Sequence, residues 1–122
     1  MGHQPSRWPL DLAQELAVAD RIDWLGEVGE PHPLIAGADV FTLPSREDPF
    51  PLVVLEAMAL ARPVVAFDVG GVREQLEDAG VVVPAGDVKA MARAVIALLE
   101  DEAERRRLGA EAARRVLSLI HI

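Results

Sequence analysis

Apolar positions along the chain alternate between two spacings. Apolar residues three and four positions apart predict helices, and short unbroken apolar runs predict strands buried on both faces. Helices are predicted over residues 9–19, 33–38, 52–61, 72–77 and from Asp87 onward, with a break near Gly109. Strands are predicted over residues 21–25, 40–43, 64–67 and 81–83. Because strands and helices alternate through short connections, the pattern predicts an α/β fold, a Rossmann-like parallel sheet flanked by helices.

The composition fits one domain with an aliphatic core. Of the 122 residues, 51% are hydrophobic but only 4% are aromatic, so Val, Leu, Ile and Ala must supply the core. No repeat or linker divides the chain, and residues 1–122 are expected to form a single domain. The sequence has no cysteine, which excludes disulfides and thiolate chemistry and fits a cytoplasmic location. No apolar run approaches the roughly 20 residues of a membrane-spanning helix.

The charge argues against nucleic acid as a partner. The formal net charge is −8, and the dense basic runs at residues 105–107 and 114–115 stand among acidic residues, as on a salt-bridged helix face. Arg62 and Arg73 could approach an anionic ligand, with salt bridges as the alternative. The histidines lack metal-ligand spacing, so surface or capping roles are expected for His3, His32 and His121.

Residues 44–51 are the strongest candidate for chemistry. Ligands of an open parallel sheet bind beyond the carboxyl ends of the strands, where this loop leads into a helix start whose free N–H groups favour phosphate. The loop carries Glu47 and Asp48, and Glu56 follows on the helix. Carboxylates accept paired hydrogen bonds from neighbouring hydroxyls, so one interpretation is a nucleotide-sugar site. The other interpretation is that these are ordinary loop, cap and solvent-facing residues.

A longer motif surrounds this loop. Residues 45–65 read SREDPFPLVVLEAMALARPVV, which resembles the signature of family 4 retaining glycosyltransferases, the glycosyl transferases group 1. In that signature two acidic residues bracket seven others and are followed by Ala-Met-Ala and a Pro-Val-Val strand. Further matches are RIDWLG at 21–26, ADVFTLPS at 38–45, VGG at 69–71 and GD at 86–87. The resemblance covers about residues 12–115 and implies the incomplete C-terminal, donor-binding half of a GT-B fold.

The resemblance assigns roles by position. Asp48 takes the first acidic position, where the family usually has Glu, and is implied to be the catalytic residue that contacts hydroxyls of the transferred sugar. Glu56 takes the second position and is implied to bind the ribose hydroxyls. The other implied donor contacts lie at the helix start, in the nucleobase loop and in a Gly-Gly turn: Phe50, Pro51, Leu52, Val53, Glu27, Val28, Gly70 and Gly71. Pro51 stands where the family often has Gly, so one possible N–H donor is absent.

The implied reaction transfers a hexose from a nucleoside-diphosphate sugar to an acceptor with retention at the anomeric carbon. No metal or other cofactor is expected, because helix amides and basic side chains neutralise the leaving diphosphate. The nucleotide, the sugar and the acceptor, whether a glycan, a lipid or a small molecule, stay open.

The resemblance also implies a fragment that is inactive alone. Nothing here resembles the family's N-terminal domain, through which the enzyme could associate with a membrane surface, or the opening βαβ stretch of its C-terminal domain. Residues 116–122 form an atypical tail. The missing stretch leaves a gap between the strands at 21–25 and 40–43, which predicts non-native pairing or exposed apolar sheet surface.

Two other functions remain open, a sugar-nucleotide epimerase of GT-B fold and a non-catalytic sugar-nucleotide-binding module, and a third, a phospho-receiver, is disfavoured. The Glu-Ala-Met-Ala run at residues 56–59 favours the transferase over the epimerase. A receiver needs a lysine after a late strand, whereas Lys89, the single lysine, falls in a predicted helix.

Overall fold

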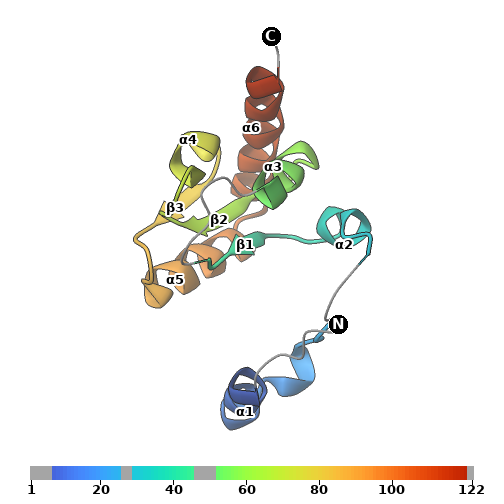
Figure 1. Ribbon diagram of the computed structural model, residues 1–122, viewed down its shortest axis with the longest axis vertical. Helices are drawn as coiled ribbons and strands as arrows, with labels where there is room; N and C mark the ends of the chain where they lie inside the picture. The colour runs from blue at the N-terminus through green and yellow to red at the C-terminus, as the bar shows by residue number, and fades with distance from the viewer. Residues whose placement is uncertain (1–6, 26–28, 46–51, 121–122) are drawn as a thin grey trace. The chain divides into compact units, whose positions relative to one another are not determined.

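The computed structural model describes residues 7–25, 29–45 and 52–120, which are drawn as coloured ribbon in Figure 1. The chain divides into two compact units, Met1–Pro31 and His32–Ile122. No helix of the described ranges is both long and apolar enough to cross a membrane.

The first unit contains helix α1 (Arg7–Glu15) and the short 3-10 helix η1 (Ala19–Arg21). A Schellman motif ends α1, because the Val18 N–H donates to the Ala13 carbonyl at 2.9 Å and the Ala17 N–H donates to the Gln14 carbonyl at 3.1 Å. Ala17 takes the left-handed position of this motif with φ 60°. The predicted helix over 9–19 therefore starts earlier and stops before its predicted end.

The strand predicted over residues 21–25 is wrong. Ile22 has extended backbone, with φ −116° and ψ 125°, but residues 22–25 join no ladder within the described part of the chain. An extended segment becomes a strand only through hydrogen bonds to a neighbour, and the sequence pattern cannot supply that neighbour. The apolar side chains of this segment, Ile22, Trp24 and Leu25, are exposed.

The second unit is built on a parallel sheet of order β1-β2-β3, with β1 at Phe41–Leu43, β2 at Val64–Phe67 and β3 at Val81–Val83. Thr42 lies opposite Val65, and Ala66 lies opposite Val82. All four residues of β2 are buried, because neighbouring strands flank it and helices cover both of its faces. The predicted strands at 64–67 and 81–83 are confirmed residue for residue, and the one at 40–43 begins one residue later.

Helices flank this sheet on both faces, as predicted. They are α2 (His32–Ala36), α3 (Leu52–Ala59), α4 (Val72–Leu76), α5 (Val88–Leu99) and α6 (Glu102–Ile120). In Figure 1, α3 and α4 lie on one side of the sheet and α5 on the other, while α6 runs beside α3. The predicted cap of α5 is confirmed, since the Asp87 carboxylate accepts the Ala90 N–H at 3.0 Å.

The helix break predicted at Gly109 is wrong, because α6 continues through this residue. A Cβ atom at position 109 would lie 2.2 Å from the Ala61 carbonyl oxygen, so glycine lets α6 approach the end of α3. That end is a second Schellman motif, in which Ala61 has φ 58° and the Arg62 N–H donates to the Ala57 carbonyl at 3.0 Å. The stretch 116–120 of the predicted tail also continues α6, with Val116 buried.

We expect Gly109→Ala to lower the free energy of unfolding by about 2–3 kcal/mol, because the methyl group collides with backbone that cannot rotate away. Urea unfolding followed by circular dichroism measures this. Gly37→Ala is the matched control, since its Cβ would meet its nearest atom at an ordinary 3.6 Å, and it should change the value by less than about 1 kcal/mol. Equal effects of the two substitutions would contradict the close α3–α6 approach.

Candidate functional site

The carboxyl ends of β1, β2 and β3 open at one edge of the sheet, because the strands are parallel. The chain leaves this edge through Pro44 and Ser45 after β1, through residues 68–71 after β2, and through residues 84–87 after β3. Helices α3 and α4 begin after the first two of these connections. This carboxyl edge is therefore where the predicted ligand site should lie.

The structure describes half of the predicted site. Outside its described residues lie Glu27, Val28, Asp48, Phe50 and Pro51. Leu52, Val53, Glu56, Gly70 and Gly71 are described, and all belong to the connections and helix starts at the carboxyl edge. The spacing between Asp48 and Glu56 in space thus stays a prediction.

Glu56 lies in the second turn of α3 with a side chain that is 39% exposed. Its Oε2 atom is 3.7 Å from Nε2 of His32, the first residue of α2, and the two form an ion pair when the imidazole is protonated. Only a surface or capping role is expected for His32 from its place in the sequence. No local spacing could have linked the two residues, because only the packing of α2 on α3 brings them together.

Leu52 and Val53 are the first two residues of α3. Leu52 is 67% exposed, whereas Val53 is partly buried and packs against the core. The first four N–H groups of a helix have no partner within it, so the backbone here can donate to an anion. That these residues contact the donor through their backbone stays a prediction.

The Gly70–Gly71 turn follows β2 and begins α4. Gly70 has φ 49°, in the left-handed region, and Gly71 is the buried N-cap of α4. An ion pair spans the turn, since Arg73 donates to Asp68 Oδ2 from Nη2 at 2.8 Å and from Nε at 3.2 Å. Through these hydrogen bonds and its charge, Asp68 raises the pKa of the Arg73 guanidinium above its ordinary value. Arg73 therefore takes the salt-bridge alternative of the sequence analysis.

The opposite edge of the sheet, where the strands begin, is the amino edge. Helix ends and several arginines lie there. Arg62 donates from Nε to the Leu60 carbonyl and from Nη1 to the Ala38 carbonyl, both at 3.1 Å. Arg105 Nη1 donates to the last carbonyls of α5, Leu98 and Leu99, at 2.7 Å each.

Arg115 does the same for α4, because its Nη2 donates to the Glu74 carbonyl at 2.7 Å and pairs with Glu77 at 3.0 Å. Cationic groups at helix C-termini satisfy free carbonyls and oppose the helix dipole. These three arginines thus stabilise the helix ends at the amino edge, and none of their hydrogen bonds reaches the carboxyl edge.

Metal binding at the described part of the carboxyl edge has no structural support. Among the described residues, no three carboxylate or imidazole groups gather closely enough to hold an ion. The expectation of a metal-free, cofactor-free reaction stays a prediction.

The chain belongs to the glycosyl transferases group 1 family, whose model matches residues 1–101. It is 36% identical over 105 residues to the N-acetyl-alpha-D-glucosaminyl L-malate synthase of Bacillus anthracis. It is 40% identical over 111 residues to the phosphatidyl-myo-inositol mannosyltransferase of Mycobacterium leprae. Each match covers 84% of this chain but only 28% and 30% of the relatives, so the chain spans less than a third of their length.

Two solved structures share the fold. Sucrose-phosphate synthase from Thermosynechococcus elongatus superposes with a TM-score of 0.84 at 36% identity, over 93% of this chain and 29% of that one. HepE of Anabaena, solved in complex with UDP, gives 0.83 at 25% identity, over 88% and 30%. The predicted membership of a glycosyltransferase family and the predicted GT-B type of α/β fold are confirmed.

Gly70→Ala should lower the free energy of unfolding by about 1–2 kcal/mol, because a side chain is strained at φ 49°. Thermal and urea unfolding report the change. Gly37→Ala, at a position without a left-handed backbone, again serves as control. A stabilised Gly70→Ala variant would contradict the left-handed turn.

Proposed function

We propose that this chain is the donor-binding part of a retaining glycosyltransferase that holds a nucleoside-diphosphate sugar at the carboxyl edge of the β1–β3 sheet. The observation that carries the proposal is the position of Glu56, a half-exposed carboxylate one turn inside a helix that starts at this edge. An anionic group beside a helix start suits a ligand that is itself part anion and part polyol.

Each part of the donor has a matching group. The diphosphate would accept hydrogen bonds from the backbone at Leu52 and Val53, and the ribose hydroxyls would donate to Glu56. Asp48, which lies outside the described residues, would accept hydrogen bonds from hydroxyls of the hexose. Gly70 and Gly71 lack side chains and would let backbone approach the ligand.

The proposed chemistry is positioning and electrostatic stabilisation. When the bond between the anomeric carbon and the leaving phosphate oxygen breaks, negative charge grows on the diphosphate. Fixed N–H dipoles at the α3 start would stabilise that charge without rearranging. Retention of configuration, the absence of a metal and a cytoplasmic location belong to this proposal.

One structural neighbour supports a nucleotide donor. The names of the two sequence relatives describe enzymes that make or transfer glycosides, and the Anabaena structure contains UDP. Because the chain spans less than a third of these proteins, we expect it to bind the donor without transferring the sugar by itself. The acceptor would bind mainly to the N-terminal domain that family membership implies.

Nucleotide binding tests the ribose contact. We expect UDP or GDP to bind the chain in isothermal titration calorimetry, and Glu56→Gln to weaken the tighter of the two by about tenfold or more, since hydrogen bonds to a carboxylate are lost. Glu100→Gln, which removes a carboxylate from the exposed C-cap of α5, should leave affinity unchanged. The proposal fails if neither nucleotide binds, or if both variants weaken binding alike.

A second comparison separates the sugar from the nucleotide. Asp48→Asn should weaken binding of the nucleotide sugar by about tenfold but leave the nucleoside diphosphate unaffected, because Asp48 is proposed to contact only the hexose. Glu56→Gln should weaken both ligands. Parallel losses in Asp48→Asn for both ligands would contradict the division of roles between the two carboxylates.

A further inference from the structure

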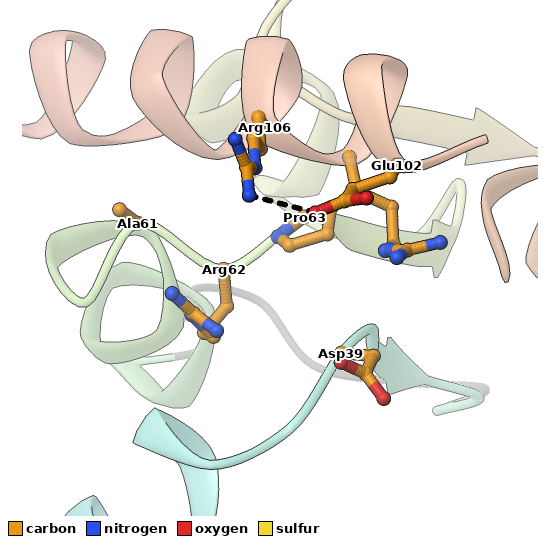
Figure 2. Close-up of a pocket in the computed structure, with 7 residues that line it drawn as sticks. Asp39, Ala61, Arg62, Pro63, Glu102 and Arg106 are labelled. Carbon is orange, nitrogen blue, oxygen red and sulfur yellow. Dashed lines mark hydrogen bonds and ion pairs between the residues drawn. The ribbon is translucent and has the colours of Figure 1, made fainter.

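A hollow of about 190 Å³ lies at the amino edge of the sheet, on the side away from the proposed donor site. It is formed where the turn that ends α3 enters β2, where the chain enters β1, and where α6 begins. Its charged and turn-forming lining residues are Asp39, Arg62, Pro63, Glu102, Arg105 and Arg106. Figure 2 shows Glu102 and Arg106 facing the Arg62–Pro63 segment from one side and Asp39 from the other.

The hollow is too small for a nucleotide sugar, because pockets for ligands of that size occupy about 300–1,000 Å³. It also gathers three of the chain's 12 basic residues in a protein of net charge −8. Glu102 accepts Arg106 Nη2 at 2.7 Å, which leaves Arg62 and Arg105 against the single carboxylate of Asp39. The lining therefore carries one net positive charge.

Two of the guanidinium groups are partly buried and held in place. Arg62 and Arg105 bond to backbone carbonyls, which carry no formal charge, and neither arginine forms a hydrogen bond or ion pair with a carboxylate of the described residues. Neither Nη2 atom has a hydrogen-bond partner among the described residues. A guanidinium that is held in place, partly buried and still has free N–H groups can form strong charge-assisted hydrogen bonds with an anion. An anion that accepts two parallel hydrogen bonds suits it best.

Asp39 adds a second kind of contact. Its side chain makes no ion pair or hydrogen bond with the described residues, and it is exposed at the rim of the hollow. A carboxylate repels a phosphate but accepts hydrogen bonds from hydroxyl groups. The lining therefore favours a ligand with an anionic end near the arginines and hydroxyls near Asp39.

We propose that this amino-edge hollow binds a small phosphorylated polyol or sugar phosphate, with Arg62, Arg105 and Arg106 around the phosphate and Asp39 on the hydroxyls. The site is separate from the donor site and does not depend on the proposed function. Bound ligand would tie the end of α3, the approach to β1 and the start of α6 to one another.

The full chain titrated with glucose 6-phosphate, inorganic phosphate and glucose at constant ionic strength tests the proposal, with NMR amide shifts as readout. We expect glucose 6-phosphate to bind saturably and more tightly than inorganic phosphate, and glucose not to bind. The shift changes should centre on residues 38–39, 61–62 and 102–106. Changes confined to residues 52–56, or the absence of saturable binding by either phosphate, would overturn the site.

Two matched variants separate a specific site from general charge attraction. Arg106→Ala and Arg107→Ala each remove one exposed arginine and one ion pair of α6, to Glu102 and to Glu104, but only Arg106 lines the hollow. We expect Arg106→Ala to weaken glucose 6-phosphate about tenfold and Arg107→Ala to change it less than twofold. Equal losses in both variants would overturn the proposal.

A charge-neutral change tests the hydroxyl contact. Asp39→Asn should bring the affinity for glucose 6-phosphate close to that for inorganic phosphate, because the paired hydroxyl contact is lost while repulsion of the phosphate falls. An undiminished preference for glucose 6-phosphate in Asp39→Asn would overturn the role of Asp39. Since both measurements follow the amino edge, a failure of nucleotide binding at the carboxyl edge leaves them interpretable.

Discussion

The burial of β2 between two parallel neighbours is the constraint on which the second unit depends. Parallel strands must each be reached by a crossover, so every helix that follows a strand starts at the carboxyl edge and ends at the amino edge. Free N–H groups therefore gather at one edge and free carbonyls at the other. The side chains follow this division, because Arg62, Arg105 and Arg115 bind carbonyls at the amino edge, while Glu56 lies near the helix starts.

Helix α6 packs against the amino-edge ends of two of these helices. It packs closely on the end of α3 through Gly109, and its Arg115 holds the end of α4. The beginnings of these same helices form the candidate donor site. Contacts at the amino edge thus fix the direction in which α3 and α4 present their N–H groups, and a residue far from the ligand can alter the precision of the site without touching it.

Local patterns predicted those parts of the fold that local physics decides. Val64–Phe67 and Val81–Val83 are unbroken apolar runs, and Asp87 caps α5 through a bond to a residue three positions away. The errors involve partners distant in sequence. Gly109 does not break α6 because Ala61 lies against it, and residues 21–25 form no strand because a strand needs a neighbour. The contact of His32 with Glu56 likewise exists only through tertiary packing.

An acidic chain can still bind a diphosphate if the attraction is local. The formal charge of −8 lowers the long-range attraction of anions, which affects association rates more than contact energies. At the described carboxyl edge Arg73 is already paired with Asp68, whereas the fixed amides that start α3 can donate without carrying a formal charge. Backbone amides at a helix start select ligands whose anionic group lies in line with their N–H bonds. Carboxylates select ligands that carry neighbouring hydroxyl groups. Net repulsion combined with such directional contacts favours ligands that satisfy both kinds of group over simple anions, which suits a nucleotide sugar better than free phosphate.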